Sequence, residues 1–447
     1  MSLLTSISAA LLIICGIYLT IKSGFFQLRG MGKVTRATFG KLIKNRDYNG
    51  FKAMAVALGS TIGIGNIIGV AAAISIGGAG SIFWMLVSGF LGMIIKYAEI
   101  HICVEEAKES HRKNGGPMYV IRNYARGKFK IFGAIFAIFC IMASFFAGNL
   151  MQSKSIFEFS MIGFGIGKMP ITLLTLPFLY VIISGKDRIY QNFSAIFVPI
   201  MSLFYIFSTL IIIFNNIANV PFAVFSIFTS AFGFDNIAGG FCGTIVSRAL
   251  SVGVMKGLFT NEAGLGSSPI AHSSAKNADG FTQGCWGIVE VFVDTVVVCM
   301  LTAIAVLSSP IYLSGRISDP FILICEIFRD TFGSFGLKAI SASAYCFAFA
   351  ALVGWAFYGI KSVCYFSHKG VYLKTYIIMY LFCIPLSCIL NNDVIWALTD
   401  VFNSFMLIPN VVLLLFVGGK AVENLKQKEN SKSALQTLSS KMRCIKN

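Results

Sequence analysis

The segment GSTIGIGN, residues 59 to 66, places three glycines inside a stretch from residue 53 to residue 95 that contains no charged side chain. A second glycine-rich segment, GGFCGT at residues 239 to 244, lies in a later apolar part of the chain. A helix broken within a membrane leaves backbone N–H and C=O groups without partners, which is costly unless a ligand, an ion or water satisfies them. The two breaks favour a ligand site, although spacings such as Gly59 to Gly63 also let helices pack closely.

The composition of the 447-residue chain is that of a membrane protein. Hydrophobic side chains make up 56% and charged side chains 12% of it, whereas a soluble domain carries about 25% charge. This excludes soluble enzymes, nucleic-acid binders and secreted disulfide scaffolds. The net charge of +17 does not indicate nucleic-acid binding, because the basic residues alternate with apolar segments instead of forming one patch. The twelve cysteines contain no CxxC pair, so neither a metal site nor a disulfide framework is indicated.

Apolar segments of about 20 residues can cross a bilayer as helices. The sequence therefore predicts an all-α integral membrane protein with eleven transmembrane helices, near residues 3 to 22, 53 to 76, 81 to 103, 131 to 153, 169 to 184, 190 to 214, 237 to 260, 281 to 308, 338 to 360, 373 to 390 and 393 to 418. The first has no basic residue before its apolar core, which favours a retained helix over a cleaved signal peptide.

The eleven helices divide into one extra helix and two sets of five. The predicted parts are an N-terminal transmembrane helix (1 to 22), a first five-helix repeat (53 to 214), a second repeat (237 to 418) and a basic tail (419 to 447). The two sets have opposite orientation, and in each the first helix carries the glycine break. Inverted repeats with broken helices are typical of secondary transporters, whose substrate sites lie at the breaks.

The basic residues predict the orientation of the chain in the cell (inner) membrane. Thirty of the 36 lysines and arginines fall in loops on one side of the predicted helices, and five fall on the other side. Because loops rich in lysine and arginine stay in the cytoplasm, we expect the amino terminus outside and the carboxyl terminus in the cytoplasm.

Several polar side chains lie within the predicted helices. Asp294 is near the middle of the eighth helix and Glu290 is one turn before it, where a charge costs about 2.5 to 3.5 kcal/mol on insertion scales. A structural ion pair with Arg248 and a role in proton or cation relay are both open. Asn149 and Gln152 end the fourth helix, and either hydrogen bonding between helices or substrate contact accounts for them.

Two other polar groups have a structural interpretation. The segment from 261 to 272 contains Glu262 and His272 but no nucleophile arranged with them, so a structured inner loop or gate is favoured over catalysis. Asp400 and Asn403 precede a proline in the eleventh helix and are interpreted as partners for its distorted backbone.

The string NEAGLGSSPIAH, residues 261 to 272, resembles the signature NEAG-[LM]-GS-x-PIAH of the alanine or glycine:cation symporter family, also called sodium:alanine symporters. Further matching motifs follow in the family's order: GNI at 65 to 67, GGPMY at 115 to 119, GN at 148 to 149, EVFVDT at 290 to 295, GW at 354 to 355 and IPN at 408 to 410. The resemblance covers nearly the whole chain. It implies a leucine-transporter-like fold, a small neutral amino acid (alanine or glycine) as substrate, and a coupled cation.

The resemblance also implies which residues form the site. The substrate-binding residues are expected to be Thr61, Gly63, Gly65, Asn66, Gln152, Gly240, Phe241, Ile245 and Trp355. Glu290 and Asp294 are the candidates for ion or proton coupling. No catalytic residue and no cofactor are expected, and sodium is the expected coupling ion. The expected partners are the amino acid, the cation and membrane lipid, with no nucleic acid.

The sequence departs from the family's pattern beside the expected sodium position. Family members commonly carry hydroxyl side chains where this chain has Ala350 and Ala351, and threonine where it has Ile64. Alanine offers no side-chain oxygen, and a hard cation needs oxygen ligands. We therefore expect transport to depend less on sodium than is usual in the family.

The alternative to a transporter is a transport-inactive or channel-like membrane protein of the same fold. The two breaks argue against a channel, because a channel needs a continuous polar lining that these helices do not show. A membrane enzyme is disfavoured by the lack of a nucleophile, base and orienting group in one arrangement.

Overall fold

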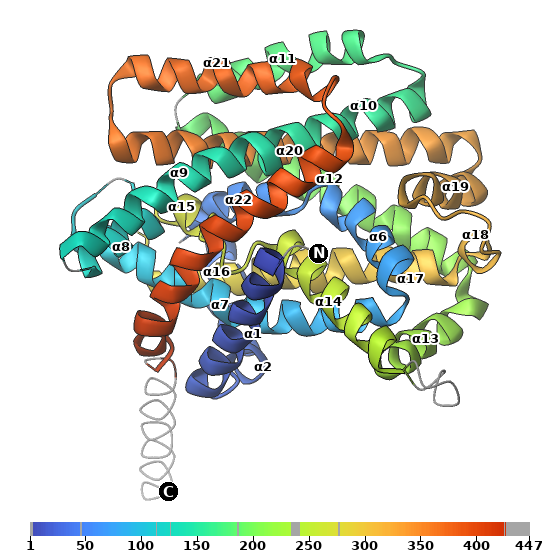
Figure 1. Ribbon diagram of the computed structural model, residues 1–447, viewed down its shortest axis with the longest axis horizontal. Helices are drawn as coiled ribbons and strands as arrows, with labels where there is room; N and C mark the ends of the chain where they lie inside the picture. The colour runs from blue at the N-terminus through green and yellow to red at the C-terminus, as the bar shows by residue number, and fades with distance from the viewer. Residues whose placement is uncertain are drawn as a thin grey trace, which may run out of the picture.

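The computed structural model is helical throughout the part of the chain that it describes, and no strand occurs there (Figure 1). The described residues are 3–44, 47–112, 114–125, 127–185, 187–233, 242–275, 278–423 and 425. The predicted all-α class is therefore confirmed.

The helices of the first half surround the first glycine break. They are α1 (Leu3–Ser23), α2 (Phe26–Arg29), α3 (Met31–Ala37), α4 (Phe39–Ile43), α5 (Tyr48–Thr61), η1 (Ile64–Asn66), α6 (Ile68–Gly77), α7 (Gly80–Glu109), α8 (Pro117–Tyr124), η2 (Gly127–Lys130), α9 (Ile131–Phe145), η3 (Phe146–Leu150), α10 (Met151–Phe164), α11 (Lys168–Ile183) and α12 (Asp187–Asn215). The short elements η1 and η2 are 3₁₀ turns, and η3 is a π-turn between α9 and α10.

The second half contains the acidic coupling candidates and the segment NEAGLGSSPIAH at residues 261 to 272. Its helices are η4 (Ile217–Asn219), α13 (Val220–Phe232), α14 (Cys242–Asn261), α15 (Ser268–His272), α16 (Gly280–Val291), η6 (Phe292–Cys299), α17 (Met300–Ser308), α18 (Pro310–Leu313), α19 (Pro320–Phe332), α20 (Ser334–Phe366), α21 (Gly370–Ser387), α22 (Asn392–Leu413) and η7 (Leu414–Gly418). The π-helical turn η6 joins α16 to α17.

Eight helical segments among the described residues are long and apolar enough to cross a membrane. Shorter apolar helices lie at Ile68–Gly77, Lys168–Ile183 and Ile217–Phe232. The predicted range 53 to 76 is divided between α5 and α6, and neither half reaches the length of a spanning helix alone. The count of eleven spans and the inverted repeat stay predictions.

The long helices cross one another around α20. In Figure 1, α9 and α22 run side by side obliquely across the front, with α20 behind them. Helix α20 packs against α9, α10, α12 and α5, while α7 packs against α14 and α16. This places the end of α5, the π-turn η3 and the middle of α20 together in the interior.

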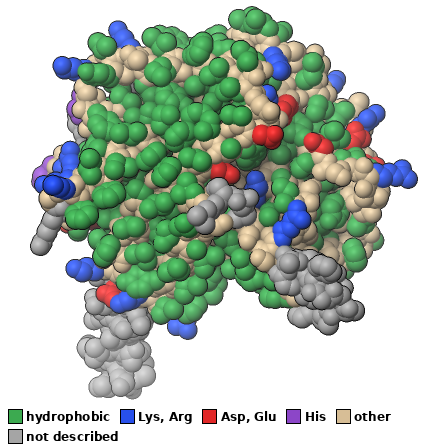
Figure 2. Space-filling model, viewed as in Figure 1, with side chains coloured by type: hydrophobic (Ala, Val, Ile, Leu, Met, Phe, Trp, Pro, Cys, Tyr) green, Lys and Arg blue, Asp and Glu red, His purple; other side chains and the backbone are tan. Residues whose placement is uncertain are grey.

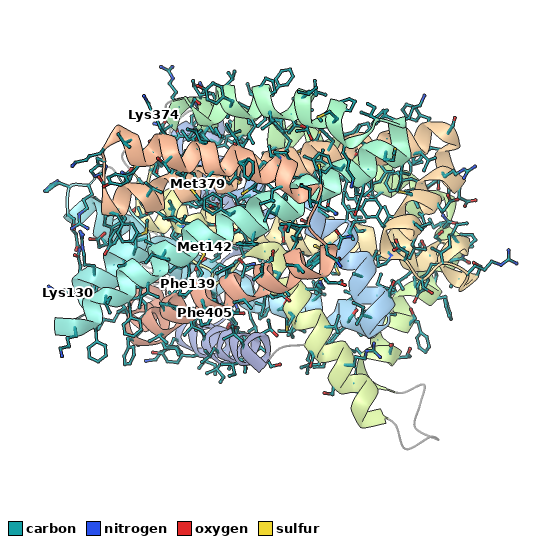
Figure 3. All side chains as sticks on the ribbon, turned by 45° about the horizontal axis from the view of Figure 1, so that its top comes forward. Lys130, Phe139, Met142, Lys374, Met379 and Phe405 are labelled. Atoms are coloured by element: carbon teal, nitrogen blue, oxygen red, sulfur yellow. The ribbon has the colours of Figure 1, made fainter. Side chains whose placement is uncertain are left out.

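Apolar side chains cover most of the face seen in Figure 2, and charged side chains gather mainly toward its edges and in a strip right of the centre. Figure 3 shows Phe139 of α9 beside Phe405 of α22, with Lys130 at one end of the same surface. The rings of Phe139 and Phe405 stack with centroids 4.8 Å apart. An apolar surface with basic residues at its end is what a lipid bilayer requires of a spanning protein.

The charge count behind the predicted orientation includes Lys96 with a cytoplasmic loop, although residue 96 lies within the predicted helix 81 to 103, and the structure corrects that assignment. Lys96 lies inside the 30-residue helix α7, and its side chain is fully buried. The proposed ion pair between Arg248 and the acids of the eighth predicted helix is also wrong, because Arg248 is exposed and the buried Glu290 pairs with Lys96 instead. Lysine is tolerated inside a membrane helix when a carboxylate compensates its charge.

Candidate functional site

The first glycine segment breaks its helix as predicted. The N–H of Ile62 is the last in α5 to donate to a carbonyl four residues back, that of Leu58 at 2.8 Å. Gly63 then takes an extended conformation, φ −128° and ψ −159°, so the helical ladder stops. Side-chain amides replace the missing backbone acceptors, since the N–H of Gly63 donates to Asn66 Oδ1 at 3.1 Å and that of Ile64 to Gln152 Oε1 at 3.5 Å.

Asn66 connects the break to Asp294. Its Nδ2 donates to Asp294 Oδ1 at 2.7 Å, and the other carboxylate oxygen accepts from Thr295 Oγ1 at 2.9 Å. Asp294 lies in the π-helical turn η6, and π-turns inside α-helices are frequent at functional sites because they re-aim side chains. A fully buried carboxylate thus sits directly behind the broken helix.

A cavity of about 60 Å³ lies at the break. Its lining includes five of the predicted substrate-binding residues, which are Thr61, Gly63, Gly65, Gln152 and Trp355. A buried water needs about 10 to 15 Å³ on this measure, so the cavity has room for roughly four to six water molecules. Asn66 is not among the lining residues and supports the break from behind. Gly240, Phe241 and the side chain of Ile245 lie outside the described residues.

Trp355 forms a fixed wall of this cavity. Its Cβ occupies the space where Gly148 of η3 would carry a side chain, and its indole meets the ring of Tyr358 edge-on, with centroids 5.6 Å apart. Tyr358 in turn exchanges a 2.7 Å hydrogen bond with Ser60 at the end of α5. The indole is therefore held between η3 and α5, which limits how far the cavity can expand.

Ala350 and Ala351 lie beside the break, as the resemblance implies. A Cβ on Gly59 would lie 3.7 Å from Ala350 Cβ, and one on Gly63 would lie 3.7 Å from Ala351 Cβ. Both alanines are buried, so methyl groups face this part of the break. Among the described residues, no group of three or more histidine, cysteine or acidic side chains is arranged to hold a metal ion.

A second, larger cavity of about 1020 Å³ adjoins the first. Lys256, Trp396 and Asp400 line both cavities and so mark their boundary. The Lys256 ammonium lies 4.4 Å from the centre of the Trp396 ring, a cation–π distance. The larger cavity is also lined by Lys154 and Lys168, two residues of the predicted outer loops.

A helix break at a small cavity, with a buried carboxylate behind it and a wider cavity on one side, is the arrangement of a secondary transporter. The model of the sodium:alanine symporter family matches residues 1–441. This chain belongs to that family.

Relatives of this symporter agree with the assignment. It is 33% identical over 425 residues to the sodium/alanine symporter AgcS of Methanococcus maripaludis, covering 93% of this chain and 92% of AgcS. It is 28% identical over 428 residues to the probable sodium/glutamine symporter GlnT of Bacillus subtilis, covering 95% and 88%. The symporter is thus a multi-pass membrane protein that couples amino acid transport to a cation, and it is not an enzyme.

A solved structure supports the fold of the symporter. The crystal structure of MhsT in complex with L-phenylalanine superposes with a TM-score of 0.56 at 16% sequence identity, covering 83% of this chain and 87% of MhsT. MhsT has a leucine-transporter-like fold, so the predicted fold family is confirmed.

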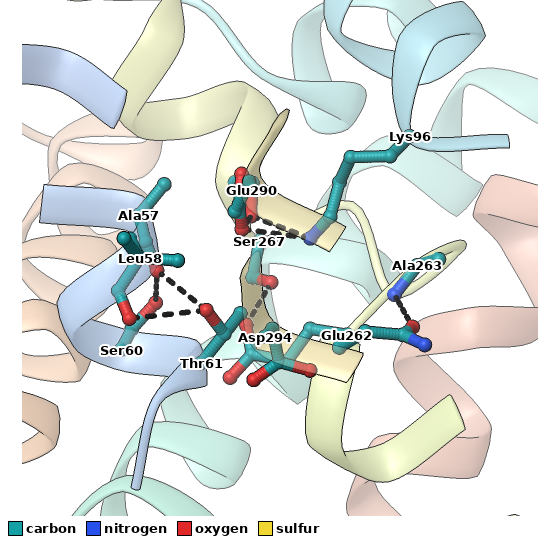
Figure 4. A network of polar contacts seen from close by, with 12 residues as sticks. Ala57, Leu58, Ser60, Thr61, Lys96, Glu262, Ala263, Ser267, Glu290 and Asp294 are labelled. Carbon is teal, nitrogen blue, oxygen red and sulfur yellow. Dashed lines mark hydrogen bonds and ion pairs between the residues drawn. The ribbon is translucent and has the colours of Figure 1, made fainter. Parts of the chain in front are cut away.

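Some residues of the symporter's site were missed from the sequence. Figure 4 shows Lys96 reaching Glu290, with Asp294, Thr61 and Glu262 grouped nearby. Lys96 was missed because it ends an uncharged run and so has the pattern of a helix boundary. The interpretation of Asp400 as a partner for its own helix did not foresee its place on the walls of both cavities.

Proposed function

We propose that this protein imports a small neutral amino acid, alanine or glycine, together with sodium. The observation that carries the proposal is the small cavity of about 60 Å³ at the first break, which has room for roughly four to six water molecules. Glycine and alanine are the smallest amino acids and suit a cavity of this size best. The pinned Trp355 wall opposes longer side chains, although discrimination by one methylene is only about 1 to 3 kcal/mol.

The substrate is proposed to bind through the broken helix. The positive amino end of α6 faces the break and suits the carboxylate of a zwitterion, while the carbonyl end of α5 suits its ammonium group or a cation. Thr61, Gly63, Gly65, Gln152 and Trp355 line the cavity and are proposed as direct contacts. Asn66 is proposed to position the break, because its amide already bonds both Gly63 and Asp294. Gly240, Phe241 and Ile245 remain proposed contacts from the second glycine segment.

Asp294 is the proposed coupling residue for the cation. Its carboxylate is buried, is linked to the break through Asn66, and has no cationic side chain within ion-pair distance among the described residues. Glu290 differs, because Lys96 already compensates its charge at 3.1 Å. The orientation with the amino terminus outside, the direction of import and the division into two repeats are parts of the same proposal.

The test is uptake of radiolabelled alanine and glycine into proteoliposomes, with sodium and proton gradients varied separately. Gly65→Leu should reduce uptake to the level of empty liposomes, because a Cβ there would already lie 3.1 Å from Thr260 Cγ2 on the cavity wall and the longer side chain would fill the cavity. Gly370→Leu is the matched control, since that exposed glycine has no neighbour within 4 Å of its Cβ position.

Normal uptake by a folded Gly65→Leu protein would place the site elsewhere. Saturable binding of alanine by the parent protein without uptake under any gradient would favour the transport-inactive alternative. Uptake that does not saturate would favour the channel-like one.

A further inference from the structure

Five buried residues form a connected polar group that the proposed transport of substrate and sodium does not use. We call it the Glu290 cluster, and its members are Lys96, Ser268, His272, Gln283 and Glu290. It joins α7, α15 and α16. Lys96, Ser268, His272 and Glu290 are all 0% exposed.

One oxygen of the Glu290 carboxylate is fully partnered. Lys96 Nζ lies 3.1 Å from Oε1 and also donates to Ser268 Oγ at 2.7 Å. Ser268 Oγ in turn donates to the same Oε1 at 2.8 Å. Buried carboxylates are normally satisfied in this way, by a counter-charge and a hydroxyl donor together.

The other oxygen faces His272 without a hydrogen bond. Glu290 Oε2 and His272 Nε2 are 3.5 Å apart, and neither atom has a hydrogen-bond partner. The second ring nitrogen, Nδ1, lies 2.7 Å from Gln283 Oε1. An amide oxygen only accepts, so Nδ1 carries a hydrogen, and a neutral ring would then turn the lone pair of Nε2 toward the carboxylate.

The orientation of the Gln283 amide follows from its other side. Its Nε2 and both carboxylate oxygens of Asp47 border the same small space beside Gly50. Because an amide nitrogen donates and a carboxylate accepts, the nitrogen belongs on the Asp47 side and the oxygen on the His272 side. A neutral His272 would therefore leave two buried acceptors facing each other, which is costly.

We propose that the Glu290 cluster is a proton-binding site, in which His272 is held as an imidazolium whose Nε2 donates to Glu290 Oε2. The proton gives the second carboxylate oxygen of Glu290 a hydrogen-bond donor and adds a hydrogen bond between α15 and α16. The titratable and charged groups that act on this pair from the surrounding elements are Lys96 and Glu99 of α7, Asp47 before α5, Glu262 after α14, Asp294 of η6 and Tyr358 of α20. Four of these groups are carboxyl groups, and Lys96 is the one cation among them.

The consequence for transport rests on the proposed function. Helix α15 belongs to the segment that begins with Glu262 and Leu265 on the cavity wall and ends at His272. Loss of the proton removes one of the bonds between this segment and α16, and leaves those of Ser268 with Glu290 and of His272 Nδ1 with Gln283. These bonds lie at the end of the molecule where Asp47 is half-buried. We expect that raising the pH on that side, the predicted cytoplasmic side, loosens α15 and changes the rate of the transport cycle.

The decisive experiment measures the protonation state of the His272 imidazole directly. The chain has only four histidines, so ¹⁵N-histidine labelling of the full-length protein in lipid nanodiscs gives a simple nitrogen spectrum. The signals of His272 are those lost in His272→Gln; if that variant does not fold, substitution of the other three histidines assigns them by elimination. At about pH 7.5, where an ordinary imidazole is mostly neutral, we expect both His272 nitrogens to be protonated.

Glu290→Gln should convert His272 to a neutral ring, whereas Glu326→Gln, which removes an exposed carboxylate of α19, should leave it doubly protonated. A neutral His272 in the parent protein would overturn the proposal. The nitrogen spectrum does not depend on uptake, so a neutral His272 in that spectrum is distinct from failure of the transport proposal. In proteoliposomes, alanine uptake should lose its dependence on the pH of the Asp47 side in His272→Gln, and an unchanged pH profile would contradict the role in the cycle.

Discussion

Replacing Lys96 by methionine removes the counter-charge of a fully buried carboxylate. Lys96 and Glu290 are each 0% exposed and 3.1 Å apart, and breaking such a pair from one side costs about 3 to 5 kcal/mol. The imidazolium proposed at His272 leaves Glu290 one counter-charge, so we expect the lower end, about 3 kcal/mol. With about 2.1 cal/mol/K of unfolding entropy per residue, 447 residues give roughly 0.9 kcal/mol/K and a fall in Tm of roughly 3 °C.

The assay is thermal unfolding of the purified protein in detergent, followed by tryptophan fluorescence. The double variant Lys96→Met with Glu290→Gln should recover most of the loss, because it removes both charges instead of stranding one. Lys22→Met is the matched control. Its partner Glu423 lies at 2.7 Å, but the two side chains are 44% and 46% exposed, and an ion pair that exposed contributes little to stability because solvent screens it.

The result that would refute the reasoning is a Lys96→Met protein as stable as the parent. It would mean that Glu290 is neutral in the folded protein and needs no counter-cation. A double variant that loses as much as the two single variants together would show instead that the two residues act independently.

Three further changes test the site. Asp294→Asn should raise the cation concentration for half-maximal alanine uptake about tenfold or more, since a hard cation prefers a charged oxygen; an unchanged value would exclude Asp294 from coupling. Ala350→Ser with Ala351→Thr should lower the half-maximal sodium concentration by adding two oxygens beside the break, and no effect would place sodium elsewhere. Gly148→Ala should overlap Trp355 Cβ, cost about 1 to 3 kcal/mol of stability and reduce alanine uptake, whereas normal stability and uptake would show that the Trp355 wall is free to move.

Helix positions could be predicted because an apolar run long enough to span the membrane leaves the backbone no alternative to helix. The break at Gly63 could also be predicted, because glycines within such an apolar run allow the helical hydrogen bonds to stop. The short helices α13 and α19 were not predicted. Val220–Phe232 continues the uncharged run from residue 189 to 234, which no charged residue divides, and Pro320–Phe332 mixes apolar and charged residues outside any predicted span.

Part of the substrate site could be predicted because few roles other than ligand binding or helix packing account for glycines and polar side chains within apolar helices. Thr61, Gly63, Gly65, Gln152 and Trp355 do line one cavity. Lys256 of α14 and Trp396 of α22 also line this cavity but are not among the predicted contacts. The charge count assigns Lys256 to a cytoplasmic loop, although residue 256 lies within the predicted helix 237 to 260. Whether a charged side chain points into the protein interior depends on how helices distant in sequence pack against one another. The sequence of a single helix does not determine that packing.

Lys96 shows what local signal was available. The residues after it, Tyr97, Ala98 and the run Ile100 to Val104, continue the apolar pattern with only Glu99 and His101 interrupting it. A single lysine with apolar sequence on both sides and an acid one turn later fits the middle of a buried helix better than its end. Moving Lys96 and Lys256 out of the loops leaves twenty-eight basic residues against five, so the predicted orientation does not depend on either. The lysine that the charge count assigns to a cytoplasmic loop is, in the structure, the counter-ion of the buried Glu290.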